Sequence, residues 1–258
     1  VAKLVLTHFG LPGHRNRFRW EPSAGRELVH FGKWIFLSTA CGFLLSQGDK
    51  AILGAYLTLD DLGIYNIGYF LASFPVLLGG AVTGRILIPI YRNHPPADSA
   101  ANAARMRRLR FGLTGVMLTL LALMGVIGQP LVVLMYDDRY LHAGVIVVAI
   151  ACVQLPQVIG MTYDQSALAA GDSRNYFLVM ALRAALQSLF FWVGAAQFGL
   201  MGALIGQFAA LFLAHGAIVW LARRHRAWDG WHDLLFGTLA AAILALILSL
   251  NWEAFASL

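Results

Sequence analysis

Charged side chains inside long apolar segments are the residues of this sequence best suited to chemistry. Residues 33–56 form a segment long enough to cross a bilayer as a helix, and Asp49 and Lys50 lie in its second half, toward the outer leaflet. Adjacent helix positions point about 100° apart, so the two side chains are not expected to face one partner. We expect them either to meet water and headgroups at the membrane surface or to line a water-filled cavity.

Arg183 and Gln187 are the strongest candidates for a functional site. They lie four positions apart in the apolar segment 176–197 and therefore share one face of a helix. Arg183 lies roughly 13 Å from the preceding turn, near the middle of the bilayer. An arginine at that depth should face a cavity or an acidic partner. A purely structural pairing is the alternative interpretation.

Other polar residues also occupy apolar segments. Arg85 and Asp164 lie near segment ends, where anchoring at the membrane surface explains them slightly better than a functional site does. The sequence also allows a salt bridge between these two residues. Gln154 and Gln157 flank Pro156, which frees a backbone carbonyl inside a helix. Kinked helices of this kind often line transporter cavities, and a static kink is the equally simple alternative.

These residues must be positioned by membrane-spanning helices. Of the 258 residues, 59% are hydrophobic and 12% are charged, whereas soluble domains average about 25% charged residues. Pro75 and the Gly79–Gly80 pair are expected to break one spanning segment, and Phe198–Gly199 to form a tight turn between two others. Seven segments are predicted to span the membrane, at residues 33–56, 64–90, 111–135, 143–170, 176–197, 200–221 and 234–250. The sequence therefore predicts an all-α, polytopic membrane helix bundle.

Basic residues gather in one of the two alternating sets of loops, which the positive-inside rule places in the cytoplasm. The other set holds Arg139 as its one basic residue, together with four aspartates. The net charge of +6 therefore reflects loop bias, and no nucleic-acid partner is expected. The basic set comprises Arg15, Arg17, Arg19, Arg26, Lys33, Arg92, Arg105, Arg107, Arg108, Arg110, Arg174, Arg223, Arg224 and Arg226.

Three regions are predicted along the chain. Residues 1–32 comprise the end of a preceding helix, at 1–11, and a basic cytoplasmic linker between lobes. Within this linker, 21–31 is expected to form an amphipathic surface helix, with a solvated loop as the alternative. Residues 33–221 form a six-helix transporter lobe, and 222–258 form a cytoplasmic loop and one more spanning helix. We therefore expect the sequence to be the C-terminal part of a longer transporter.

Several function classes find no support in the residues. A Gly-rich phosphate loop ending in Lys-Ser/Thr is absent, so no ATPase engine is expected. The two cysteines lie in apolar segments and are interpreted as packing residues. The eight histidines lack ligand spacing, and no Ser/His/Asp arrangement is recognisable. We therefore expect no catalytic residues, no metal site and no cofactor, and hence no enzyme. Several tryptophans fall at predicted membrane interfaces, as in an aromatic belt: Trp20, Trp34, Trp220, Trp228, Trp231 and Trp252.

Two stretches carry a resemblance to a known family. They are FGKWIFLSTACGFLLSQGDKAILGAYLTLDDLGIYNIG, residues 31–68, and TYDQSALAAGDSRNYF, residues 162–177. Both resemble the C-terminal lobe of polysaccharide or oligosaccharide flippases, of the O-antigen type, in the MOP exporter superfamily. The acidic-basic step Asp49–Lys50 and the motif 62–65, LGIY, are the matching residues of the first stretch. With the spacing of six spans after a basic linker, the resemblance extends over most of the chain.

The resemblance implies a two-lobe, rocker-switch transporter of the bacterial inner membrane. Members of this superfamily move undecaprenyl-diphosphate-linked glycans to the outer leaflet for O-antigen, capsule or exopolysaccharide assembly. The implied partners are the bilayer, the lipid-linked glycan, an N-terminal lobe of the same chain and other polysaccharide-assembly proteins.

A diphosphate substrate needs cationic partners. The resemblance therefore implies substrate binding by Arg183 and Gln187, with Lys50 and Arg85 as further cations. It leaves Asp49 and Asp164 as ion-coupling candidates. A multidrug or other lipid exporter of the same superfamily is the main alternative function. A membrane polysaccharide polymerase or ligase is a weaker alternative, because such enzymes usually carry a large loop on the outer side and none is predicted here.

Overall fold

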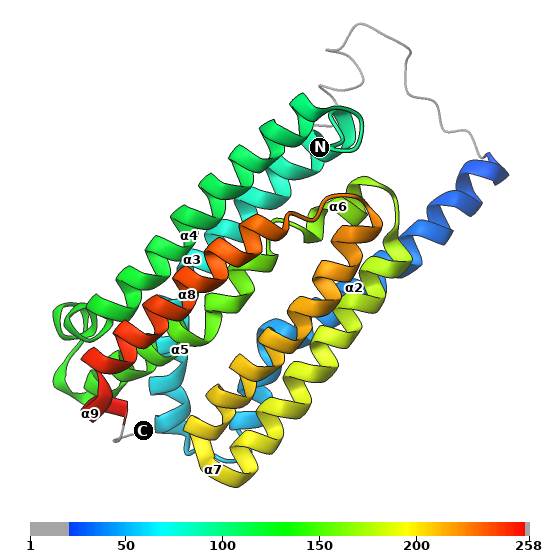
Figure 1. Cartoon of the computed structure of the whole chain (residues 1–258). Helices are drawn as coiled ribbons and strands as arrows, with labels where there is room; N and C mark the ends of the chain where they lie inside the picture. Colours follow the sequence, from blue (N-terminus) through cyan, green and yellow to red (C-terminus); the bar gives the residue numbers. More distant parts are fainter. Residues whose placement is uncertain (1–20, 256–258) are drawn as a thin grey trace, which may run out of the picture.

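The computed structural model describes residues 21–255, and these form a helical bundle without strands (Figure 1). The predictions for residues 1–11 and 12–19 lie outside the described residues. The helices are α2 (Pro22–Leu53), α3 (Leu59–Asn93), α4 (Ala100–Met135), α5 (Leu141–Gly160), α6 (Asp164–Ala169), α7 (Ser173–Arg224), α8 (Gly230–Leu250) and α9 (Trp252–Phe255), with a single 3-10 turn at Asp138–Tyr140. The predicted all-α polytopic bundle is confirmed.

Six helices of the described chain are long and apolar enough to cross a membrane, and one of them, α7, consists of two arms joined at a kink. Phe198 and Gly199 leave helical geometry, and Gly199 has a φ of 61°. The arms 173–197 and 200–224 therefore run antiparallel, as the hairpin in Figure 1 shows. Gly194 and Gly202 allow the arms to meet backbone to backbone, because a Cβ at either position would collide with the other residue. The predicted tight turn is confirmed, and with two arms in α7 the described helices account for the seven predicted spans.

The two ends of α7 are joined by Asp172. Its carboxylate caps the helix by accepting a hydrogen bond from the Asn175 backbone N–H, 3.3 Å away. The same carboxylate lies 3.1 Å from His225 Nε2 and 3.5 Å from Arg224 Nε at the other end of the hairpin. Burial raises the pKa of Asp172, but hydrogen bonds from Asn175 and the contact with His225 bring it below its ordinary value. The charged form of Asp172 thus links the two ends of the hairpin.

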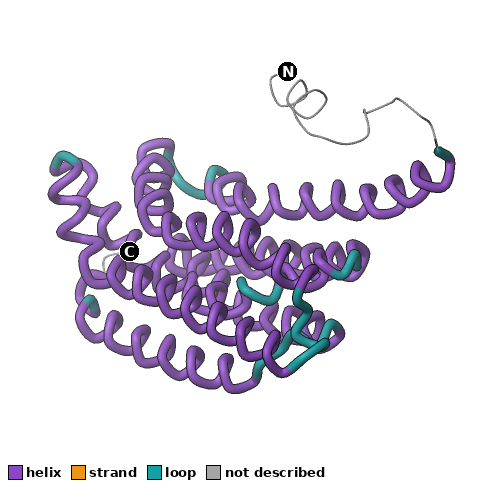
Figure 2. Tube along the Cα trace, turned by 90° about the horizontal axis from the view of Figure 1, so that it is seen from above, coloured by secondary structure: helices purple, strands orange, loops and turns teal. Residues whose placement is uncertain are grey.

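The apolar helix α5 lies at the centre of the bundle. The most apolar stretch of its span is 89% buried, and every residue from Ala143 to Leu155 is buried. α5 packs against α3, α4, α7 and α8, and its side chains contribute to the largest apolar core. By contrast, the corresponding stretch of α2 is only 6% buried. Figure 2 shows α2 extending sideways from the bundle, so α2 depends on lipid or another protein to cover its apolar surface.

Several predicted helix boundaries were wrong. The separate surface helix at 21–31 is instead the first part of α2, which is continuous from Pro22 to Leu53. α3 continues through Pro75 and Gly79, because neighbouring helices pack around the freed backbone groups of a spanning helix. The fourth span breaks where no break was predicted, at residues 161–163 between α5 and α6. The division into three regions stays a prediction; its boundaries at 32 and 221 lie within α2 and α7.

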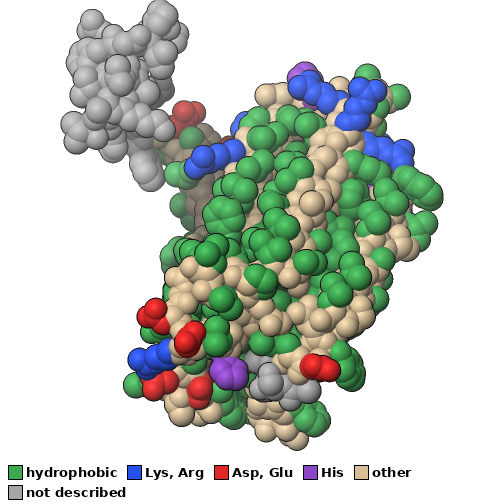
Figure 3. All heavy atoms as spheres, turned by 90° about the vertical axis from the view of Figure 1, so that its left-hand side faces the viewer, with side chains coloured by type: hydrophobic (Ala, Val, Ile, Leu, Met, Phe, Trp, Pro, Cys, Tyr) green, Lys and Arg blue, Asp and Glu red, His purple; other side chains and the backbone are tan. Residues whose placement is uncertain are grey.

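The predicted loop at 91–110 is much shorter in the structure. α4 begins at Ala100, where the Ser99 side chain accepts a hydrogen bond from the Asn102 backbone N–H. Arginines assigned to the loop therefore lie on a helix. Figure 3 shows Lys and Arg side chains gathered at one end of the molecule and acidic side chains near the other, with apolar side chains between them. This separation agrees with a cytoplasmic end that is basic.

The turn after α7 is held in a left-handed conformation by Arg226, whose φ is 51°. The Arg226 N–H donates to the Arg223 carbonyl and the Ala227 N–H to the Ala222 carbonyl, the pattern of a Schellman cap. Glycine is favoured at this position, because a Cβ costs about 1 kcal/mol there. Arg226→Gly should therefore stabilise the protein by about 0.5–1 kcal/mol, measured as a higher midpoint of thermal unfolding in detergent. A lower midpoint would contradict this account of the cap.

The lowered pKa of Asp172 predicts that the protein loses stability as the solution becomes acidic. Because its folded pKa lies below the ordinary value of 3.8, its contribution is complete above that pH and is lost as the pH falls through the folded pKa. Asp172→Asn should lower stability at pH 7 and flatten the loss of stability below about pH 4. Thermal unfolding measured from pH 3 to 7 tests this. The exposed Asp98→Asn is the control, and an equal flattening there would exclude Asp172 as the cause.

Candidate functional site: buried charges between the helices

An ion pair joins α7 to α6 within the bundle. Arg183 Nη1 lies 2.9 Å from Asp164 Oδ2, and the two side chains are 9% and 16% exposed. Asp164 is the first residue of α6, so the break after α5 places this carboxylate against the first arm of α7. The Arg183 Nε has no hydrogen-bond partner in the described part of the chain. The guanidinium therefore keeps a free donor beside its acidic partner.

Gln187 lies on the same face of α7, one turn further along. Its side-chain N–H donates to the Leu45 carbonyl of α2 at 3.0 Å. The ring of Trp34 contacts Phe177 at a centroid distance of 5.4 Å, and Gly48 also lies close to α7. Arg183 and Gln187 therefore connect the first arm of α7 to two neighbours, α6 and α2.

A second buried charge lies on α2 one turn beyond Leu45. Asp49 is 2% exposed and accepts a hydrogen bond from the Tyr65 hydroxyl of α3 at 2.7 Å. Lys50 Nζ lies 3.5 Å from Asp49 Oδ1 and 4.0 Å from the ring centroid of Tyr69. Tyr65 and Tyr69 are four residues apart on α3, so Asp49 and Lys50 face the same helix.

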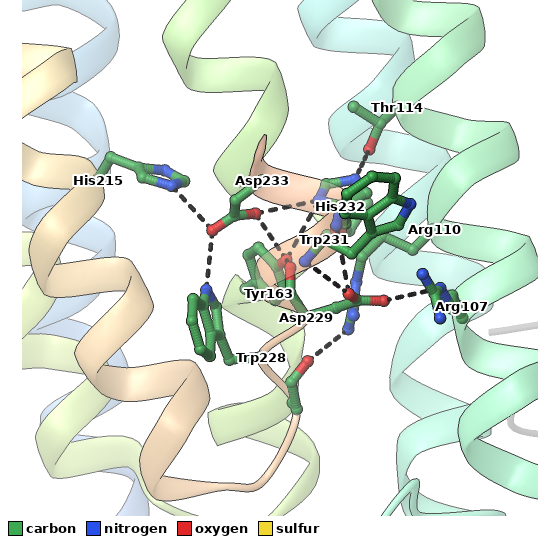
Figure 4. Close-up of polar contacts among 12 residues, drawn as sticks. Arg107, Arg110, Thr114, Tyr163, His215, Trp228, Asp229, Trp231, His232 and Asp233 are labelled. Carbon is green, nitrogen blue, oxygen red and sulfur yellow. Dashed lines mark hydrogen bonds and ion pairs between the residues drawn. The ribbon is translucent and has the colours of Figure 1, made fainter. Parts of the chain in front are cut away.

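A larger polar cluster lies at the beginning of α8, where α4, α7 and the α5–α6 turn meet (Figure 4). Arg110 is 3% exposed, and its Nη2 donates to the Tyr91 hydroxyl and the Ala227 carbonyl, each at 2.7 Å. Its guanidinium also stacks 4.3 Å from the ring centroid of Tyr163. Arg110 thus joins α4 to α3, to the α5–α6 turn and to the loop before α8.

Asp233 is the acceptor at the centre of this cluster. The Tyr163 hydroxyl donates to one of its oxygens at 2.7 Å, and the Trp228 indole N–H donates to the other at 2.9 Å. His215 Nε2 and His232 Nδ1 lie 3.2 Å and 3.1 Å from the same carboxylate. His232 is fully buried, and the Thr114 hydroxyl lies 2.9 Å from its other ring nitrogen, Nε2. Among the described residues, no group of three or more His, Cys, Asp or Glu side chains has a metal-site arrangement.

A family model described as "Polysaccharide biosynthesis protein" matches residues 3–145, more than half of the chain. The chain belongs to the polysaccharide biosynthesis protein family. This confirms the resemblance found in the sequence and makes the chain a multi-pass membrane protein with a role in polysaccharide biosynthesis. No curated protein and no solved structure matches the chain. The matched region includes three of the predicted site residues, Asp49, Lys50 and Arg85. The other three, Asp164, Arg183 and Gln187, lie beyond its end at residue 145.

The structure brings five of the six predicted site residues of this polysaccharide biosynthesis protein into two separate groups and leaves Arg85 outside both. Arg183 meets an acidic partner, one of its two predicted environments, and that partner is Asp164. The alternative salt bridge between Arg85 and Asp164 was wrong, because Arg85 is exposed and forms no ion pair with a described residue. Asp49 and Lys50 meet different residues, Tyr65 and Tyr69, but both of these lie on α3, because the long lysine side chain bends toward that helix.

Gln154 forms a structural contact in the core. Its side-chain N–H donates to the Ser73 hydroxyl of α3 at 2.9 Å, and its carbonyl oxygen has no partner in the described chain. α5 continues past Pro156 to Gly160 as a helix. Gln154 therefore links α5 to α3 within the otherwise apolar centre of the bundle.

The cluster around Arg110 and Asp233 was missed by sequence reasoning. Arg110 was counted as a solvated loop arginine, because a basic run marks the membrane side and not the depth of each side chain. A usable signal did exist, since Arg110 and Thr114 share a helix face four residues apart. Trp228, assigned to an interfacial belt, also donates a hydrogen bond into the cluster.

The Tyr65 hydroxyl is expected to stabilise the buried Asp49 carboxylate. Tyr65→Phe removes this hydrogen bond and should lower the free energy of unfolding by about 1–3 kcal/mol. Thermal or denaturant unfolding in detergent measures the effect. Tyr56→Phe removes a hydroxyl from a half-exposed tyrosine in the following loop and should have little effect. Equal stability of the Tyr65 variant and the wild type would show that the hydrogen bond contributes nothing.

Proposed function

We propose that this protein is part of a flippase that moves a lipid-linked oligosaccharide across the bacterial inner membrane. The proposed substrate is an undecaprenyl-diphosphate-linked glycan, carried from the cytoplasmic to the outer leaflet for O-antigen or exopolysaccharide assembly. Family membership and the multi-pass bundle support this proposal. In this proposal the protein is not an enzyme, and it carries the glycan without changing its bonds.

The observation that carries the proposal is the Arg183–Asp164 pair. A guanidinium offers several donors in one plane, which suits the neighbouring oxygens of a diphosphate. In the observed conformation Asp164 neutralises Arg183, so the arginine can be buried without a substrate. When the substrate is bound, its diphosphate takes the place of Asp164 as the partner of Arg183. A cationic substrate would instead meet an arginine, which disfavours a multidrug exporter.

The exposed apolar surface of α2 supports a second lobe as a partner. Phe36 and Phe43 are 74% and 69% exposed, although they lie in a spanning helix. α2 packs on the described chain mainly through α7. We infer that the remaining faces of α2 contact lipid and the other lobe of the transporter. The Gln187 side chain donates a hydrogen bond to the α2 backbone. A movement of α2 would therefore be transmitted to the face of α7 that carries Arg183.

Substitution of Arg183 tests the transport role. In the complete chain, Arg183→Gln should reduce surface polysaccharide by about tenfold or more at matched amounts of membrane protein, because a buried charge-assisted contact to the diphosphate is lost. Arg183→Lys keeps the ion pair but not the planar donors, and should give an intermediate level. Surface polysaccharide is measured by gel electrophoresis or immunoblotting of cell extracts.

Asp164→Asn is the matched control for this substitution. It breaks the same ion pair but retains the arginine, so a structural defect would appear equally in both variants. The proposal expects Asp164→Asn to retain more surface polysaccharide than Arg183→Gln at equal protein levels. Unchanged surface polysaccharide in Arg183→Gln would remove this residue from the mechanism.

A further inference from the structure

A pocket of about 560 Å³ opens at the cytoplasmic end of the bundle. The first turns of α4 and the loop between α7 and α8 form its walls. Its ionisable lining consists of Arg107, Arg110, Arg226 and Asp229. Three guanidiniums thus face one carboxylate, which leaves an excess of positive charge in a concave site. A pocket of this composition is suited to an anion.

The three arginines are held in different ways. Arg110 forms a buried wall, fixed by Tyr91 and Ala227, and its Nε has no hydrogen-bond partner in the described chain. Arg107 is half-exposed, and its Nε lies 3.3 Å from Asp229 Oδ2. Arg226 is exposed and makes no ion pair with a described residue. The pocket therefore combines a rigid cation with two that can turn toward a ligand.

The backbone at Arg226 provides independent support for a binding role. Arg226 occupies the left-handed position of the Schellman cap after α7, where glycine would be the unstrained residue. A bulky residue held in this conformation is a feature that points to a function of its side chain. The strained turn places the arginine at the pocket, beside the buried Ala222–Ala227 contact of the cap.

Aromatic residues of the kind found at membrane interfaces lie beside the pocket. Trp228 lines it and Trp231 follows in the first turn of α8, and both indoles are partly exposed, as is common at a membrane interface. The apolar span of α8 begins at Gly230, immediately beside the pocket. Phosphate is the anionic group that lipids present at such an interface, and basic pockets between spanning helices on the cytoplasmic side suit it.

We propose that this pocket binds the phosphate of a lipid headgroup from the cytoplasmic leaflet. Arg226 and Arg107 contact the phosphate oxygens, and Arg110 supplies a fixed positive charge behind them. Two lipids share this chemistry: an anionic phospholipid of the bilayer, and the diphosphate lipid of the transport substrate. In the second case the inference rests on the proposed function and makes the pocket a loading site, separate from Arg183.

Lipid binding by the purified complete chain tests this proposal. Native mass spectrometry in detergent would compare phosphatidylglycerol, undecaprenyl diphosphate and phosphatidylcholine. The wild type should bind at least one of the two anionic lipids more tightly than phosphatidylcholine, and the tighter of the two identifies the source of the phosphate. Arg226→Gly and Arg226→Asn should each weaken that binding by about fivefold or more, because a charge-assisted contact is lost.

Both substitutions suit the left-handed backbone, so an unchanged or higher unfolding midpoint would separate lost binding from misfolding. Arg174→Ala is the control, because it removes an exposed arginine from the same cytoplasmic end outside the pocket. Equal binding by the Arg226 variants and the wild type, or an equal loss in Arg174→Ala, would overturn the proposal. Inorganic pyrophosphate, titrated calorimetrically, should bind much more weakly than the lipid; equal affinity would overturn the assignment to a lipid.

This test is independent of the transport assay. The Arg183 variants leave the pocket intact and should bind anionic lipid as the wild type does. If the pocket binds lipid as proposed but Arg183→Gln leaves surface polysaccharide unchanged, the proposed transport mechanism is contradicted and the pocket is retained. If Arg183→Gln loses surface polysaccharide but the Arg226 variants bind lipid as the wild type does, the pocket is contradicted and the flippase is retained.

Discussion

The cost of placing charge inside a bilayer governs this structure, and the Arg183–Asp164 ion pair meets that cost by pairing opposite charges directly. Neither residue could be buried alone, since removing one partner of a buried pair costs about 3–5 kcal/mol. The pair joins two elements, α6 and the first arm of α7, that are separated from each other by a single turn. The break between α5 and α6 therefore has a physical consequence, because it moves Asp164 off the axis of α5 and toward α7.

Apolar packing and ionic contacts lie in different parts of the bundle. α5 supplies an apolar centre on which most other helices pack, whereas ionic contacts lie around it at defined depths. Asp49 and Lys50 link α2 to α3 near one end, and Asp233 links α8 to its neighbours near the other. Such contacts are directional, so each fixes the rotation of a helix that apolar packing alone would leave less defined. A helix movement during transport would have to exchange these partners.

The number and type of spans were predictable from the sequence because a spanning helix must satisfy every backbone group internally and be apolar over its length. Breaks were harder to predict. Pro75 leaves α3 intact, while residues 161–163 interrupt a span without a proline, because packing against neighbours decides where a helix can bend. Local patterns also located the tight turn at Gly199, where the glycine adopts a positive φ.

The partners of the buried charges could not be predicted in the same way. The predicted depth of Arg183 in the membrane called for a cavity or an acidic partner, but the choice of Asp164 depends on how α6 packs against α7. The contact of Lys50 with the same helix as Asp49 was not predicted, because helix geometry gives the direction of Cβ and not the reach of a flexible side chain. Arg110 was assigned to a loop because the length of α4 is not encoded in charge bias.

The most direct measurement is transport by a charge-swapped protein, Arg183→Asp combined with Asp164→Arg, in the complete chain. The exchange keeps an ion pair between α6 and α7 but moves the guanidinium to a different helix. If Arg183 holds the substrate diphosphate, the swapped protein should reach near-normal levels in the membrane and still fail to restore surface polysaccharide. Restoration of surface polysaccharide to the wild-type level would contradict this role and leave the pair as a structural contact between α6 and α7.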